Sequence, residues 1–142
     1  MTEQQDEAMA RLQGLHPETL EIPKKLDTLL KVITRDFTYY TVLMAYYNAP
    51  MERIRIGKLM SITGETKAVL RPVIDHFLYH KILVQHGGLF PSYQYNILQN
   101  ENQWHVPMQQ FAKLMKYPKY HRYFMGRITK KKPVVPPGPS SA

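Results

Sequence analysis

The sequence has no cysteine and no long apolar run, and its second half has few acidic residues. Without cysteine the chain cannot form disulfides, thiolate zinc sites or a cysteine nucleophile, so its stability must come from packing. No stretch approaches the roughly 18 uninterrupted apolar residues that a membrane span requires. The opening segment 2–7 is polar and lacks the features of a secretory signal. We therefore expect a cytoplasmic, nucleoid-associated protein without a membrane partner.

Charge is distributed unevenly along the 142 residues. Residues 1–36 contain seven acids and five bases (net −2), whereas residues 37–142 contain four acids and fourteen bases (net +10), which together give +8. The segment 113–132 has eight bases and no acid. Such a segment attracts polyanions, above all nucleic acid, because binding releases counterions. The alternative is a solvated tail that only aids solubility.

Apolar residues recur at helical spacing in several segments. The pattern predicts an amphipathic helix over 24–33, an aromatic-rich helix over 37–48 and a helix of two turns over 56–60. Gly64 suits the left-handed turn that follows, because glycine adopts positive φ at low steric cost. Thr66 is then expected to be the N-cap of the next helix.

A β-hairpin is expected after that helix. The run 82–85 is β-prone, His86-Gly87-Gly88 is a turn, and Tyr93, Tyr95 and Ile97 alternate with polar residues as in a half-buried strand. The predicted fold class is therefore mainly α with a small β-hairpin (α+β).

These elements divide the chain into four predicted parts. Residues 1–23 form a polar N-terminal extension, and residues 24–98 form the main domain. Residues 99–128 are a helical, basic C-terminal extension, and residues 129–142 are a Pro/Ser-rich tail that we expect to be disordered.

The segment 64–83 resembles the recognition-helix region of bacterial winged-helix regulators of the MarR and ArsR types. Gly64 matches the turn glycine of that pattern and Thr66 its hydroxyl cap. The apolar core and closing positions are matched by Leu70, Ile74, Phe77, Ile82 and Leu83. Lys81 stands where the family commonly has glycine, and the resemblance covers roughly residues 37–98.

The resemblance implies a winged helix-turn-helix with flanking N- and C-terminal helices. It also implies a homodimer that places the 66–81 helix of each subunit in successive major grooves, with the hairpin tip near a minor groove. Sequence-specific double-stranded DNA binding by a dimeric transcription regulator is therefore the function we expect.

The face of the 66–81 helix opposite Leu70 and Ile74 is expected to meet DNA. Arg71 and Lys67 are candidates for base or phosphate contacts, and Thr66 for capping with a backbone contact. The remaining DNA-binding candidates are Ala68 on this helix, Arg53, Arg55 and Lys58 before and within the preceding helix, and Lys113, Lys116, Lys119 and Arg122 in the C-terminal segment. For the three bases at 53–58, a solvated helix entrance is the alternative.

Three features argue against DNA reading. Pro72 removes a helical hydrogen bond at a cost of about 3 kcal/mol, so either the helix kinks there or it begins there. The turn at 86–89 has no Arg or Lys for a minor groove, and Asp75 faces outward. These features favour an alternative function, a winged-helix protein–protein interaction module of replication, recombination or regulation with a basic nucleic-acid-binding tail.

Other clusters of chemical groups are weaker signals. His76 and His80 are four residues apart on one helix, a spacing that can share a metal, but no further ligands are evident. The sequence has no nucleophile elbow, phosphate loop or metalloprotease motif, so we expect neither catalysis nor a cofactor. Tyr117, Tyr120 and Tyr123 alternate with bases and are candidates for stacking on nucleobases.

Overall fold

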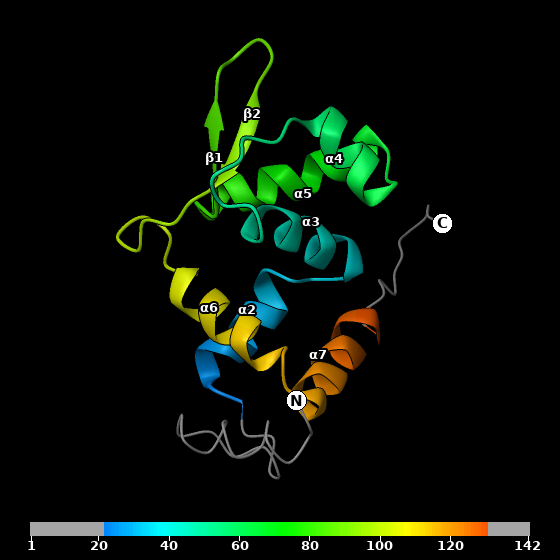
Figure 1. Ribbon diagram of the computed structural model, residues 1–142, viewed down its shortest axis with the longest axis vertical. Coiled ribbons are helices and arrows are strands. Elements are labelled where there is room, and N and C mark those ends of the chain that lie inside the picture. Colours follow the sequence, from blue (N-terminus) through cyan, green and yellow to red (C-terminus); the bar gives the residue numbers. More distant parts are fainter. Residues whose placement is uncertain (1–21, 131–142) are drawn as a thin grey trace. The chain divides into compact units, whose positions relative to one another are not determined.

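The computed structural model describes residues 22–130, and within them it contains six helices and one two-stranded antiparallel sheet (Figure 1). This confirms a mainly helical α+β protein. Contacts group the chain into two compact units, Phe37–Val106 and the two flanking segments 22–36 and 107–130. The domain boundaries proposed at residues 24 and 98 stay a prediction. The expected N-terminal extension and C-terminal tail lie largely outside the described residues.

The unit Phe37–Val106 begins with three helices, α3 (Phe37–Tyr47), α4 (Ile56–Thr63) and α5 (Lys67–Tyr79). Its core is apolar, and the Tyr46 side chain of α3 is completely buried within it. The Tyr46 hydroxyl donates a hydrogen bond of 3.1 Å to the Ile54 carbonyl. This bond ties α3 to the segment that leads into α4, and burial raises the pKa of Tyr46.

The turn between α4 and α5 is formed as the sequence predicts. Gly64 has φ = 77°, and its N–H bonds to the Met60 carbonyl at the end of α4. Thr66 is the N-cap of α5, and its side-chain oxygen accepts a hydrogen bond from the Val69 N–H at 3.3 Å. Helix α5 begins at the next residue and continues through Pro72, so the alternative in which the helix starts at Pro72 is wrong.

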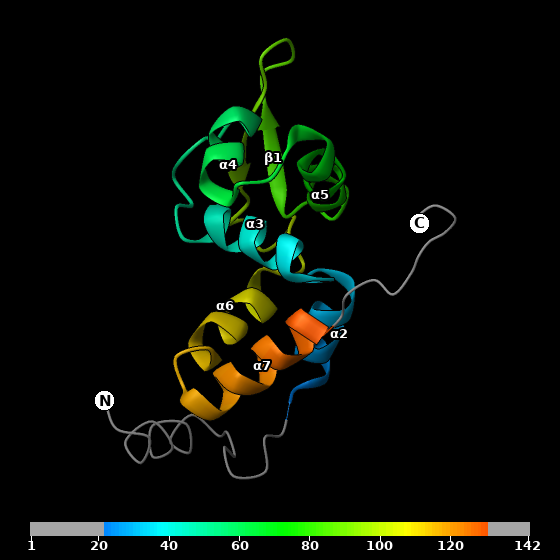
Figure 2. The same cartoon turned by 90° about the vertical axis from the view of Figure 1, so that its right-hand side faces the viewer.

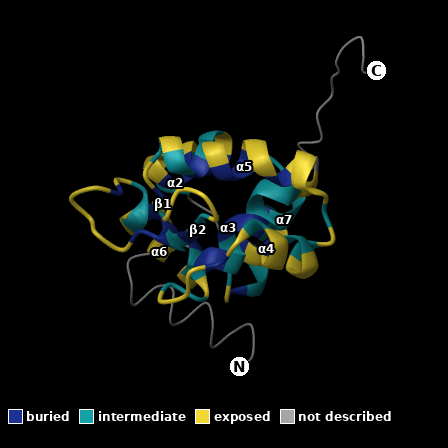
Figure 3. Ribbon diagram, turned by 90° about the horizontal axis from the view of Figure 1, so that it is seen from above, coloured by how far each residue is buried: buried dark blue, intermediate teal, exposed yellow. Residues whose placement is uncertain are grey.

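Helix α5 has two distinct faces, which Figure 3 shows as dark blue and yellow segments. The residues that face the core are Leu70, Val73, Ile74 and Phe77. The exposed residues are Lys67, Ala68, Val69, Arg71, Pro72, Asp75 and Tyr79. The predicted outward face of this helix is thus confirmed, with Arg71 on its border.

The hairpin pairs β1 (Leu83–His86) with β2 (Ser92–Tyr95) in antiparallel register, from Leu83 opposite Tyr95 to His86 opposite Ser92. The two strands rise beside α5 in Figure 1. Tyr93 and Tyr95 of β2 are buried in the core of the unit. An isolated bridge joins Ile54 to Tyr93 through two backbone hydrogen bonds of 2.8 and 3.0 Å. The hairpin is therefore anchored to the chain segment that precedes α4.

Ile97 was expected to continue the second strand, and this prediction is wrong. The strand ends at Tyr95, and Ile97 is 51% exposed. The cause is Asn96, which is buried and whose side-chain oxygen accepts a hydrogen bond from the Leu98 N–H at 3.0 Å. Its amide nitrogen also donates to the Lys81 carbonyl at 3.2 Å. Asn96 therefore ends the strand by bonding to nearby groups of the chain.

Lys81 has a left-handed backbone with φ = 61°. A residue with a Cβ is strained in this region by about 1–2 kcal/mol, and glycine is not. Lys81→Gly relieves this strain, but the greater freedom of glycine in the unfolded chain offsets part of the gain. We therefore expect the substitution to raise the free energy of unfolding by about 0.5–1 kcal/mol. Urea denaturation followed by circular dichroism measures this. Lower stability in this variant would contradict the strain argument.

The second unit contains α2 (Lys24–Val32), most of α6 (His105–Leu114) and α7 (Pro118–Lys130). Helices α6 and α7 lie side by side in Figure 2. The rings of Phe111 and Phe124, one from each of these helices, are 5.2 Å apart between centroids and are both buried. None of the helices in residues 22–130 has the length and apolar character that a membrane crossing demands.

Two of the three tyrosines proposed for base stacking, in α7 and the turn before it, have buried rings. Tyr117 and Tyr120 are buried in the core. The Tyr123 hydroxyl accepts a hydrogen bond from Arg127, which also donates one of 2.7 Å to Asp27 of α2. The bond from Arg127 lowers the pKa of Asp27. The stacking hypothesis is therefore wrong for Tyr117 and Tyr120, and for Tyr123 it stays a prediction.

Candidate nucleic-acid interface

A groove of about 890 Å³ lies within the unit Phe37–Val106. Three pieces of chain bound it: the segment 53–58, which includes the start of α4, the first half of α5, and the tip of the hairpin. We call it the cationic groove. Its lining residues are Arg53, Arg55, Ile56, Gly57, Lys58, Lys67, Arg71, Gly88, Leu89, Phe90, Pro91 and Tyr93.

The charge of this unit is concentrated at the groove. Residues 37–106 contain six Lys and Arg residues, and five of these line the groove, while Lys81 is the sixth. The four acids of the same segment, at 52, 65, 75 and 101, are not among the lining residues. A cavity with five positive charges and no negative charge favours an anion with several charges over a neutral small molecule.

Two helix N-termini add to the positive potential. Residues 56–58 of α4 and Lys67 of α5 line the groove, and each is in the first turn of its helix. The N–H groups of a first turn have no helical partners and leave a partial positive charge there. Neither first turn contains an acid, although acids are the residues that stabilise this end of a helix. The sequence thus places bases where they are least favourable for folding.

Arg71 is held in place from within the hairpin. Its Nη1 atom donates a hydrogen bond of 3.0 Å to the hydroxyl of Tyr93, a buried residue of β2. One bond of this kind restricts the guanidinium but leaves other N–H donors for a ligand, since arginine has five. The arrangement fits a group that binds phosphate or a base edge with little loss of side-chain freedom.

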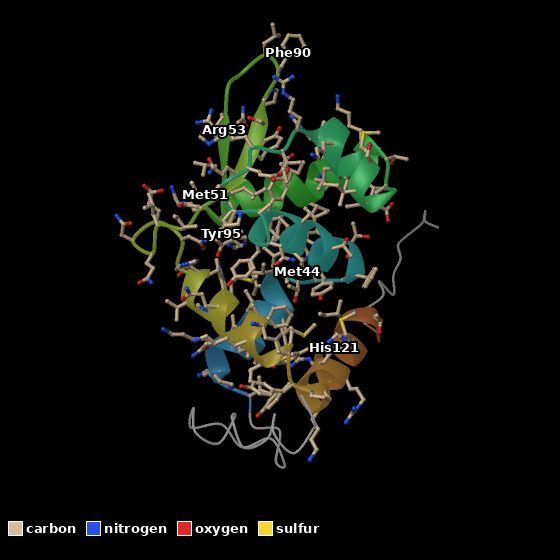
Figure 4. The ribbon with its side chains drawn as sticks, viewed as in Figure 1. Met44, Met51, Arg53, Phe90, Tyr95 and His121 are labelled. Carbon is tan, nitrogen blue, oxygen red and sulfur yellow. The ribbon has the colours of Figure 1, made fainter. Side chains whose placement is uncertain are left out.

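The hairpin tip carries two large apolar side chains, as the Phe90 label of Figure 4 shows for one of them. Leu89 is 84% exposed and Phe90 is 70% exposed. The turn before them depends on Gly87, whose φ of 84° is unfavourable for other residues. The sequence shows that this turn lacks bases, but it does not by itself identify Phe90 as a functional residue. An apolar pair next to two glycines in a turn was the signal available.

The structure brings together some of the predicted site residues and separates others. Those that line one groove are Arg53, Arg55, Lys58, Lys67 and Arg71. Thr66 and Ala68 are exposed at the start of α5 but do not line it. The remaining candidates, Lys113, Lys116, Lys119 and Arg122, belong to the other unit. Lys113, Lys116 and Arg122 are exposed there, and Lys119 is half-buried.

The two histidines of α5 lie ring to ring. The His76 and His80 centroids are 4.6 Å apart, and His80 also contacts the Trp104 ring at 6.0 Å. Burial lowers the pKa of His80, and the neighbouring His76 lowers it further. Across residues 22–130, no group of three His, Asp or Glu side chains is placed to hold a metal ion. The pair is part of the aromatic packing around α5.

Comparisons of this chain with protein families, with curated proteins and with solved structures found no match.

Proposed function

We propose that this protein is a winged-helix protein that binds double-stranded DNA through the cationic groove. The observation that carries the proposal is the gathering of five of the unit's six bases at one groove between α4, α5 and the hairpin. Phosphate contacts supply most of the affinity of such proteins, and they come from Lys, Arg and helix N-termini. The groove offers all three.

The order of elements supports the winged-helix assignment. Helices α3, α4 and α5 are followed by an antiparallel hairpin. Ile54, in the segment between α3 and α4, forms an isolated bridge with Tyr93 of β2. In helix-turn-helix proteins the second helix of the motif enters the major groove, and here that helix is α5. Lys67 and Arg71 would then reach the DNA from α5, while Arg53, Arg55 and Lys58 would bind flanking phosphates.

The role we propose is that of a dimeric transcription regulator, in keeping with the MarR and ArsR resemblance. In such a dimer the two α5 helices, one from each subunit, enter two successive major grooves. The spacing of the two half-sites then equals the helical repeat of DNA. The exposed bases of the second unit, Lys113, Lys116 and Arg122, would add phosphate contacts that do not depend on sequence.

One observation favours a second candidate function, a protein–protein interaction module. The second half of α5 exposes Asp75 and Tyr79, and Tyr79 is 81% exposed. An exposed tyrosine beside a carboxylate suits a protein surface better than a phosphate backbone. Loss of partner capture but not of DNA binding in Tyr79→Ala would assign that half of α5 to a protein.

Salt-dependent binding tests the DNA proposal. Arg55→Ala is expected to weaken binding to a labelled DNA duplex about fivefold and to reduce the slope of log affinity against log salt by about 1, because one phosphate contact is lost. Lys81→Gly removes the same charge outside the groove and serves as the matched control. Fluorescence anisotropy at several salt concentrations measures both. Equal losses in the two variants would show that net charge, not the groove, determines binding.

A further inference from the structure

We propose that Phe90, together with Leu89, inserts between base pairs of the bound DNA from the minor-groove side and kinks the duplex. This inference rests on the proposed DNA-binding function and specifies how the hairpin acts in it. Its starting point is the hairpin tip, where two large apolar side chains are exposed at adjacent positions. Residues 86–92 contain no Lys, Arg, Asp or Glu, so the tip offers DNA an apolar surface without a charged side chain.

The position of the tip decides what it can contact. Leu89 and Phe90 line the same groove as the five bases, so a ligand held by those bases meets the tip as well. Such a ligand must carry several negative charges and also offer flat apolar surfaces within a few ångströms of them. A DNA duplex does both, because its stacked bases lie directly inside the phosphate backbone.

Hydrogen bonds of the hairpin order the turn that carries Leu89 and Phe90. The Gln85 amide donates to the Gly87 carbonyl at 3.0 Å, and His86 Nε2 lies 2.9 Å from Gln94 Oε1 across the two strands. The Gln94 amide in turn donates to the Pro50 carbonyl at 3.0 Å, which links the hairpin to the loop after α3. Because these bonds already order the turn, insertion requires little further loss of conformational freedom.

Insertion of an apolar side chain has a known consequence for the DNA. The wedge partly unstacks one base step and bends the duplex toward the major groove. Pyrimidine–purine steps such as TA and CA are the easiest to unstack, so the tip selects for these steps without hydrogen bonds to base edges. This explains how the hairpin acts on DNA although it lacks the cation that usually enters a minor groove.

The test uses the full-length protein and duplexes of about 25 base pairs with 2-aminopurine at a central TA step and dyes at both ends. The variants are Phe90→Ala, the conservative Phe90→Trp, and Val84→Ala as a control. Val84 is 38% exposed on the same hairpin but does not line the groove. Wild type, Phe90→Trp and Val84→Ala are expected to raise the 2-aminopurine fluorescence and to shorten the end-to-end distance.

Phe90→Ala is expected to lose both signals and to bind the TA duplex about tenfold more weakly, while its salt slope stays that of wild type. If wild type binds with a steep salt slope but leaves the 2-aminopurine signal unchanged, insertion is wrong and the proposed function stands. If wild type binds no duplex, both are wrong. Vesicles of phosphatidylserine and phosphatidylcholine test the other surface to which a basic groove with an apolar tip could bind. Vesicle binding that requires Phe90, with duplex binding that does not, overturns the inference.

Discussion

A variant with both Arg55→Glu and Lys58→Glu is expected to bind double-stranded DNA about 100-fold more weakly than the wild-type protein. Both side chains line the cationic groove. Each reversal replaces an attraction to phosphate by a repulsion, and a loss of about 1.4 kcal/mol at each site corresponds to about tenfold in affinity. Fluorescence anisotropy with a labelled duplex at about 0.1 M salt measures the change, since higher salt screens it.

The weaker binding of this variant would not arise from unfolding. Arg55 is the N-cap of α4 and Lys58 is in its first turn, and Arg55 makes no side-chain capping bond. An acid in the first turn interacts favourably with the helix dipole, and a base does not. The double variant is therefore expected to be at least as stable as wild type in urea denaturation. Reduced binding by a protein of undiminished stability would locate the effect in the groove.

A matched reversal in the second unit serves as the control. Lys113→Glu with Lys116→Glu changes the net charge by the same amount, and both side chains are exposed. We expect this pair to weaken binding by about threefold to tenfold, through the loss of contacts that do not depend on sequence. A loss as large as that of the groove variant would contradict the assignment of the groove as the principal DNA-binding surface.

The parts of the fold that could be predicted are those that local chemistry determines. The turn glycine at Gly64 and the cap at Thr66 depend on neighbouring backbone groups, and the structure confirms both. The buried stripe of α5 follows from the helical repeat alone. The hairpin was expected too, but its end was misplaced, because the bond from the Asn96 amide to the Lys81 carbonyl spans 15 positions that no local pattern relates.

The five bases of the groove could be predicted from the sequence, but their gathering at one groove could not. Arg53, Arg55 and Lys58 were named as a separate group from Lys67 and Arg71, because only tertiary packing brings the start of α4 against α5 and the hairpin. The bond from Arg71 to Tyr93 spans 22 positions in the sequence and could not be foreseen. Bases and tyrosines alternate after residue 115, and this spacing suggested stacking on nucleobases. The same spacing occurs in a helix whose tyrosines are packed in a core, so the sequence alone does not distinguish the two.

Replacing Pro72 by alanine is expected to raise the free energy of unfolding by about 2 kcal/mol. Pro72 is the sixth residue of α5, where an N–H would bond to the Ala68 carbonyl. An interior proline costs a helix about 3 kcal/mol, and the variant gives back about 0.4–1 kcal/mol because alanine leaves the unfolded chain less restricted. Pro72 is exposed, so the substitution leaves no cavity in the core. Urea denaturation followed at 222 nm measures the gain.

Asp75→Ala is the control for this substitution, because Asp75 is exposed further along α5 and the change affects only helix propensity, by a few tenths of a kcal/mol. A Pro72→Ala variant no more stable than this control would show that the proline ring makes favourable contacts that offset the missing bond. If the gain is found, Pro72 costs the protein a substantial fraction of its free energy of unfolding. This proline is next to Arg71, which Tyr93 holds in the groove. Local rules of this kind are broken in natural proteins mainly at functional sites, so the gain would itself favour a binding role for this face of α5.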